Sequence, residues 1–127
     1  MKTIIFLLIL APVVAFSTSL DRPHDISVTA DALIAAYDGN EVAANAKYKG
    51  VRVGISGAVY KVSVDTDGDP YVVFAGHAHG TILNVRCKFS QAYNAKVATV
   101  RVGALIGIHG IVDGKHGSNL IVKDCSL

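Results

Sequence analysis

The 127-residue chain has no tryptophan, one methionine, three prolines and two cysteines. Few prolines and twelve glycines without a regular period exclude a collagen-like or low-complexity chain. Charged residues make up only 17% against 51% hydrophobic residues, which excludes a disordered chain, because such chains combine few apolar groups with high net charge. Two cysteines are too few for a disulfide-dense miniprotein. The length fits one globular domain.

The first residues have the pattern of a secretory signal peptide. Lys2 supplies a positive charge, residues 4–10 form an apolar run, and small residues Ala15 and Ser17 precede the expected cleavage point. The run is shorter than the roughly 20 residues that span a bilayer. No cysteine follows it to accept a lipid. We therefore expect cleavage of residues 1–17, no membrane anchor afterwards, and a periplasmic or secreted protein. Residues 18–28 lack periodicity and are expected to form a flexible leader.

Export changes the interpretation of charge and cysteines. Loss of Lys2 lowers the formal net charge from +2 to +1, which gives no strong attraction to nucleic acid or membranes as a whole. Cys87 and Cys125 are far apart in the sequence and lack the spacing of a redox or zinc motif. An even cysteine count in an oxidising compartment suggests a structural disulfide.

The mature chain changes from helical to strand periodicity. Thr29 and Asn40 are placed to cap two helices, which begin near residue 30 and continue to residue 47. Alternating patterns predict strands at 51–64, 71–74, 81–89, 104–112 and 119–125, with a short helix at 91–98. Glycines 54 and 57 suggest a bulge or strong coiling in the first strand. This order predicts a mainly β, five-stranded OB-fold barrel over residues 29–127 with an N-terminal helical segment. An open α+β sheet is the alternative.

Several segments resemble one protein family. The block at residues 40–50, NEVAANAKYKG, is similar to the opening signature of the tRNA_anti-like family, and so are Val51, Val53, Gly57 and Val59. The segments at 67–72, 85–89 and 122–125 resemble its first hairpin, third strand and chain end. The resemblance implies an exported OB-fold protein of a group described as nucleic-acid-binding, no defined catalytic residues, and a disulfide between Cys87 and Cys125. In an OB-fold these cysteines lie on the third and fifth strands, which meet where the barrel closes.

Motifs that suggest catalysis or metal binding are incomplete. Asp65, Asp67 and Asp69 resemble the start of a calcium loop, but Pro70 and a strand follow where further ligands are required, so a hairpin turn is favoured. His77 and His79 form an H-x-H pair, while the positions of His109 and His116 relative to it are open. Neither a nucleophile elbow nor a phosphate loop occurs. We expect no enzyme activity, cofactor or metal.

OB-folds bind ligands on the face of their second and third strands. The residues expected on that face and beside it form a basic and aromatic set: Arg52, Tyr60, Lys61, Tyr71, Arg86 and Lys88. Such a set is typical of a surface for single-stranded nucleic acid or another anionic polymer. An ordinary solvated sheet face is the simpler interpretation. The sequence therefore predicts a non-catalytic binding module, with an envelope protein partner or a metal at His77 and His79 as alternatives.

Overall fold

The computed structural model describes residues 25–76 and 80–127. The predicted signal peptide, the leader up to residue 24, and the histidine pair His77 and His79 lie outside the described residues. No helix among the described residues is long and apolar enough to cross a membrane.

The N-terminal part forms two helices at the predicted places. Helix α1 (Ala30–Gly39) begins where the Thr29 hydroxyl accepts a 3.0 Å hydrogen bond from the backbone N–H of Ala32. Helix α2 (Glu41–Tyr48) begins where the Asn40 side chain accepts one of 3.0 Å from the N–H of Ala43. Both caps satisfy amide groups that the first helical turn leaves without partners. The two predicted capping residues are confirmed.

Six strands and one further helical segment make up the rest of the described chain. The strands are β1 (Ile26–Thr29), β2 (Arg52–Val64), β3 (Pro70–Ala75), β4 (Asn84–Lys88), β5 (Leu105–His116) and β6 (Asn119–Ser126). Between β4 and β5 lie a 3-10 turn, η3 (Gln91–Tyr93), and α3 (Asn94–Val97). The short helix predicted at 91–98 is therefore present in two parts, and Ser90 precedes it without a side-chain capping bond.

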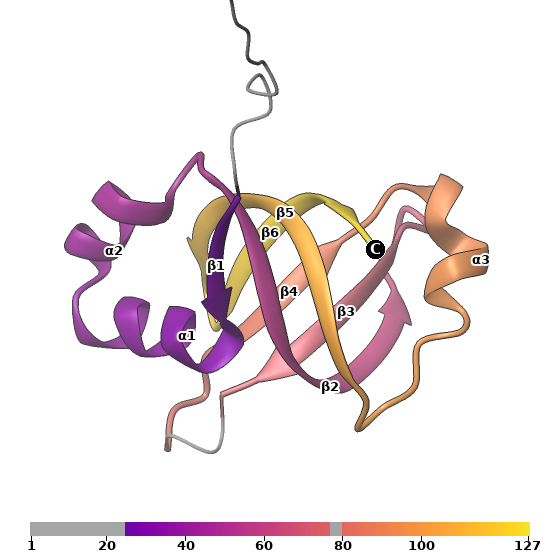
Figure 1. The fold of residues 1–127 in the computed structure, drawn as a ribbon, viewed down its shortest axis with the longest axis horizontal. Coiled ribbons are helices and arrows are strands. Elements are labelled where there is room, and N and C mark those ends of the chain that lie inside the picture. The colour runs from indigo at the N-terminus through magenta and orange to yellow at the C-terminus, as the bar shows by residue number, and fades with distance from the viewer. Residues whose placement is uncertain (1–24, 77–79) are drawn as a thin grey trace, which may run out of the picture.

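The strands pair around a closed ring (Figure 1). Strands β2, β3 and β4 are antiparallel neighbours, β4 pairs in parallel with β6, β6 pairs with β5, and β5 returns to β2. The predicted third and fifth strands correspond to β4 and β6, and they do meet. The face of β4 that carries Val85 and Cys87 is buried, and both residues are at 0% exposure.

The number of strands corrects the sequence prediction. The structure has six strands rather than five, because Ile26–Thr29, expected to be mostly flexible leader, pairs in parallel with Val53–Ser56. Since β3 pairs only with β2 residues from Val59 onward, the earlier part of β2 can accept β1. A four-residue strand with three exposed residues carries too little apolar alternation to be recognised in the sequence.

The irregularity in β2 also differs from the prediction. The register shifts between Val59 and Lys61, so the bulge lies at Tyr60 rather than at Gly54 or Gly57. Gly57 serves close packing instead: a Cβ there would lie 3.0 Å from the Cβ of Ala30 and 3.1 Å from the Phe74 ring. The bulge is set by pairing with β3, which the composition of β2 alone does not reveal.

Candidate functional site

Four of the six predicted ligand-binding residues lie on one face of three neighbouring strands. Val72 and Phe74 of β3 belong to the core, so the alternate residue Tyr71 lies on the outer face. In the ladder Tyr71 is opposite Lys88 of β4, and Val73 is opposite both Arg86 of β4 and Lys61 of β2. We call this surface the basic face; it consists of Lys61, Tyr71, Arg86 and Lys88.

Tyr71 and Arg86 form the centre of the basic face. The guanidinium carbon of Arg86 lies 4.1 Å from the centroid of the Tyr71 ring. Tyr71 is only 6% exposed, so its ring supports the arginine rather than offering a free stacking surface. The Nε of Arg86 is buried and has no hydrogen-bond partner in the described part of the chain. The arrangement fixes the direction of one cation above the buried residues Tyr71 and Val73 of β3.

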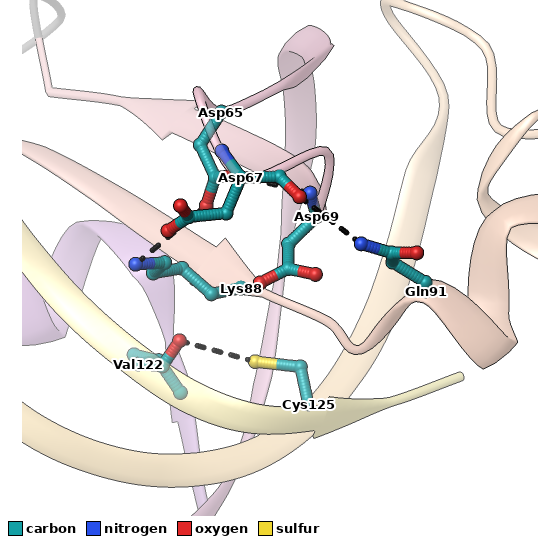
Figure 2. A network of polar contacts seen from close by, with 7 residues as sticks. All are labelled: Asp65, Asp67, Asp69, Lys88, Gln91, Val122 and Cys125. Carbon is teal, nitrogen blue, oxygen red and sulfur yellow. Dashed lines mark hydrogen bonds and ion pairs between the residues drawn. The ribbon is translucent and has the colours of Figure 1, made fainter.

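The predicted acidic cluster is a hairpin turn beside this face (Figure 2). The Asp65 carboxylate accepts hydrogen bonds from the N–H groups of Asp67 and Asp69, at 2.9 and 3.0 Å. These bonds, chiefly that from Asp69, lower the pKa of Asp65, with smaller contributions from Lys88 and Arg86. Asp65 also lies 3.8 Å from the Lys88 ammonium. Carboxylate oxygens of the three aspartates lie within 4.8 Å of one another, but turn formation accounts for the arrangement.

Arg52 lies apart from the basic face. Its Nε is 3.4 Å from the carboxylate of Asp25, and its Nη2 donates a 3.3 Å hydrogen bond to the hydroxyl of Ser126. The same Asp25 oxygen lies 2.5 Å from Nδ1 of His109. Arg52 thus connects the start of the described chain to β6, and its charge is partly neutralised there.

Tyr60 is separated from Tyr71 by the bulge and borders a cleft. Tyr60 is 55% exposed, and Leu105 of β5 is 82% exposed. The cleft has a volume of about 700 Å³ and lies where α1 begins, beside β2, the end of β3 and the start of β5. The sequence analysis did not predict this cleft, because its lining comes from five elements: β1, α1, β2, β3 and β5. The one local signal of this cleft in the sequence is Leu105, an apolar residue on an exposed strand face.

Cys87 and Cys125 meet inside the ring of strands. Both are buried free thiols in this structure. The Cys125 thiol donates a 3.3 Å hydrogen bond to the carbonyl of Val122 (Figure 2). A hydrogen bond with Cys125, together with burial, raises the pKa of Cys87. The proximity inferred from the strand order is confirmed, and the disulfide itself stays a prediction.

Comparison with known proteins identifies the family. The tRNA_anti-like family model matches residues 2–126. The chain belongs to the tRNA_anti-like family. The resemblance found in residues 40–50 and in the later strands is thereby confirmed. No curated protein matches this tRNA_anti-like chain.

A solved structure shares the fold. A crystal structure of a "putative nucleic acid-binding lipoprotein" from Klebsiella pneumoniae subsp. pneumoniae MGH 78578 superposes with a TM-score of 0.63. The sequences are 15% identical, and the match covers 80% of this chain and 90% of that one. At this identity the likeness establishes the architecture and leaves the ligand to the chemistry of the site.

Proposed function

We propose that this tRNA_anti-like protein is an exported, non-catalytic OB-fold module that binds single-stranded nucleic acid or a similar anionic polymer on its basic face. The observation that carries the proposal is that Lys61 of β2 and Arg86 and Lys88 of β4 share one face of three adjacent strands, β2, β3 and β4. Those strands include β3 and β4, which correspond to the second and third strands of an OB-fold, the usual ligand face. The description of the Klebsiella protein as nucleic acid-binding is in line with it.

The charges of the basic face indicate modest affinity. Lys61 has no ion-pair partner among the residues that the structure describes, and Arg86 is held on Tyr71. Lys88 is partly neutralised by Asp65. About two phosphates can therefore be neutralised, and each contributes about 0.7 to the slope of log affinity against log salt for a single strand. Binding should be detectable at low salt and decline clearly as salt rises.

The export and non-catalytic parts of the proposal have separate support. The matching solved structure is named a lipoprotein, and residues 1–17 have the signal pattern. For the non-catalytic part, the hydroxyl of Ser126 accepts a hydrogen bond from Arg52 and the ring of His109 contacts Asp25, so each of these two groups has another partner. The metal alternative depends on His77 and His79, which lie outside those residues.

Fluorescence anisotropy with a labelled single-stranded oligonucleotide tests the proposal. Lys61→Glu reverses a charge on the basic face and should lower affinity at low salt about tenfold or more, because attraction becomes repulsion. Lys49→Glu is the matched control, since Lys49 is also an exposed lysine but follows α2. It makes the same change in net charge and should have a much smaller effect.

Two results would overturn the proposal. One is the absence of binding by the mature protein at low salt. The other is binding that Lys61→Glu and Lys49→Glu weaken equally, which would indicate attraction to net charge rather than to a site. Binding of a protein partner that tolerates salt would favour the alternative of an envelope protein-interaction module.

A further inference from the structure

The cleft beside Tyr60 arises from a gap in the strand pairing. Strand β1 pairs with β2 as far as Ser56, and β3 pairs with β2 only from Val59 onward. The intervening residues, Gly57 and Ala58, pair with β5 alone. This leaves an opening in the sheet between the start of α1 and the end of β3. The strands still close into a ring (Figure 1), and the gap in pairing coincides with the cleft, which we call the notch.

Small residues keep the notch open. Gly107 lines it, and the nearest atom to a Cβ built there is the carbonyl oxygen of Ile55 at 3.9 Å, so the space above Gly107 is empty. Ser56 and Ala58 also line the cleft and project little. Tyr60 and Leu105 stand at its sides with 55% and 82% of their surface exposed. Exposed apolar groups beside a cleft of about 700 Å³ are typical of a binding site.

The lining determines what can enter. Asp31 is its single charged side chain, while the remaining residues are apolar or small and polar: Thr29, Ala30, Ser56, Gly57, Ala58, Val59, Tyr60, Phe74, Ala75, Leu105, Ile106 and Gly107. The lining offers no lysine, arginine or histidine to a phosphate. A flat, uncharged group with apolar faces fits the tyrosine ring and the leucine side chain. Nucleobases have this chemistry and stack on aromatic side chains.

The position of Lys61 connects the cleft to the basic face. Lys61 follows Tyr60 directly, and because the bulge places an extra residue in β2 at this point, both side chains are exposed. A single-stranded nucleic acid whose phosphate contacts Lys61 can place the neighbouring base against Tyr60. We propose that the cleft is a base-binding subsite, which rests on the proposed function and adds that the ligand is recognised through its bases as well as its charge.

A comparison of two oligomers of equal charge tests the subsite. The probes are a labelled oligothymidylate and an abasic oligomer with the same number of phosphates, measured by anisotropy at one low salt concentration. The mature protein should bind the oligothymidylate about tenfold more tightly, because one stacked base contributes an effect of this order. Gly107→Leu fills the cleft and should remove this difference while leaving the affinity for the abasic oligomer unchanged.

Matched controls separate filling the cleft from general damage. Gly39→Leu is a control for Gly107→Leu, because a Cβ at Gly39 meets nothing within 4 Å and Gly39 lies at the end of α1. Leu105→Ser, at a surface residue, should also remove the preference for the oligothymidylate, without filling the cleft. Its control is Ile82→Ser, since Ile82 is equally exposed at 82% and does not line the cleft.

The failure of the subsite can be told from the failure of the proposed function. Equal, salt-dependent affinity for the two oligomers, with Gly107→Leu and Leu105→Ser both without effect, would overturn the subsite and leave binding to the basic face intact. Failure of both oligomers to bind at low salt would overturn the subsite together with the proposed function.

Discussion

At the scale of single residues, contacts decide what a side chain is available to do. Tyr71 looks like a stacking platform in the sequence, but Arg86 covers its ring in the structure. Arg52 was grouped with the ligand face, yet it bonds to Ser126 and contacts Asp25 at another part of the ring. Asp65 could hold a cation by residue type, but its carboxylate closes a turn. The residue types indicated which interactions these side chains can make, but not which residues they contact.

Asp65 gives a pH-dependent prediction. Its pKa is lower in the folded protein than the ordinary value of about 3.9, because backbone N–H groups stabilise the carboxylate. The stability that it contributes is therefore complete above about pH 4 and is lost as the pH falls through the folded pKa. Asp65→Asn should lower stability at pH 7 and reduce the loss between pH 4 and 2. Denaturant unfolding measures both.

Asp67→Asn is the control for this prediction, because Asp67 lies in the same turn and its backbone, not its carboxylate, bonds to Asp65. It should change the acid dependence less than Asp65→Asn does. An unchanged stability difference between pH 7 and pH 2 in Asp65→Asn would contradict the role given to Asp65.

At the scale of elements, local sequence patterns predicted the helices and the long strand, whereas features that depend on strand pairing were not predicted. The capping residues Thr29 and Asn40 predicted two helices, because a cap bonds to residues only two or three positions away. Alternation predicted the long strand β2. The bulge at Tyr60 and the existence of β1 were not predicted, because each depends on a partner strand. The parallel pairing of β4 with β6 is what brings the two cysteines together.

The parallel pairing of β4 with β6 predicts a disulfide between Cys87 and Cys125 in the exported protein. Both thiols are buried in the core and lie on the paired strands β4 and β6, so an oxidising compartment should join them. Cysteine counting on protein denatured without reductant should find no free thiols. Reduction should lower the free energy of unfolding by about 3–4 kcal/mol, since the bond closes a loop of this length in the unfolded chain.

Two free thiols in the exported protein would contradict this prediction. Cys125→Ser measured with and without reductant supplies the control. It removes the bond in either condition, so any remaining effect of reductant on its stability must have another origin.

At the scale of the whole molecule, the ring of strands encloses one core and leaves its outer surface for binding. The core includes residues from helices α1, α2 and α3 and from strands β2 to β6. The basic face lies on β2, β3 and β4, and the cleft lies where β1 and α1 join β2. The family and the mainly β class could be predicted from the sequence. The division of the surface into a basic face and a largely apolar cleft could not.

Export is a prediction about the whole chain. The apolar run at residues 4–10 should direct secretion, with removal of residues 1–17. Intact mass of the protein from the producing cells' exported fraction should match a chain that begins at residue 18, within a few residues. Replacing Leu7 and Leu8 with arginine should retain the full-length chain inside the cell. Full-length protein in the exported fraction would contradict cleavage.

The sequence by itself determined the helix caps, the strand periodicity, the hairpin turn at residues 65–70 and the family. These features depend on neighbours a few positions away, so local sequence patterns indicate them. The tertiary structure alone decided that Arg86 lies on Tyr71, that Arg52 is paired elsewhere, and that a cleft opens beside Tyr60. It also placed Cys87 against Cys125. These contacts join residues distant in sequence, and they exist only once the strands have closed into a ring.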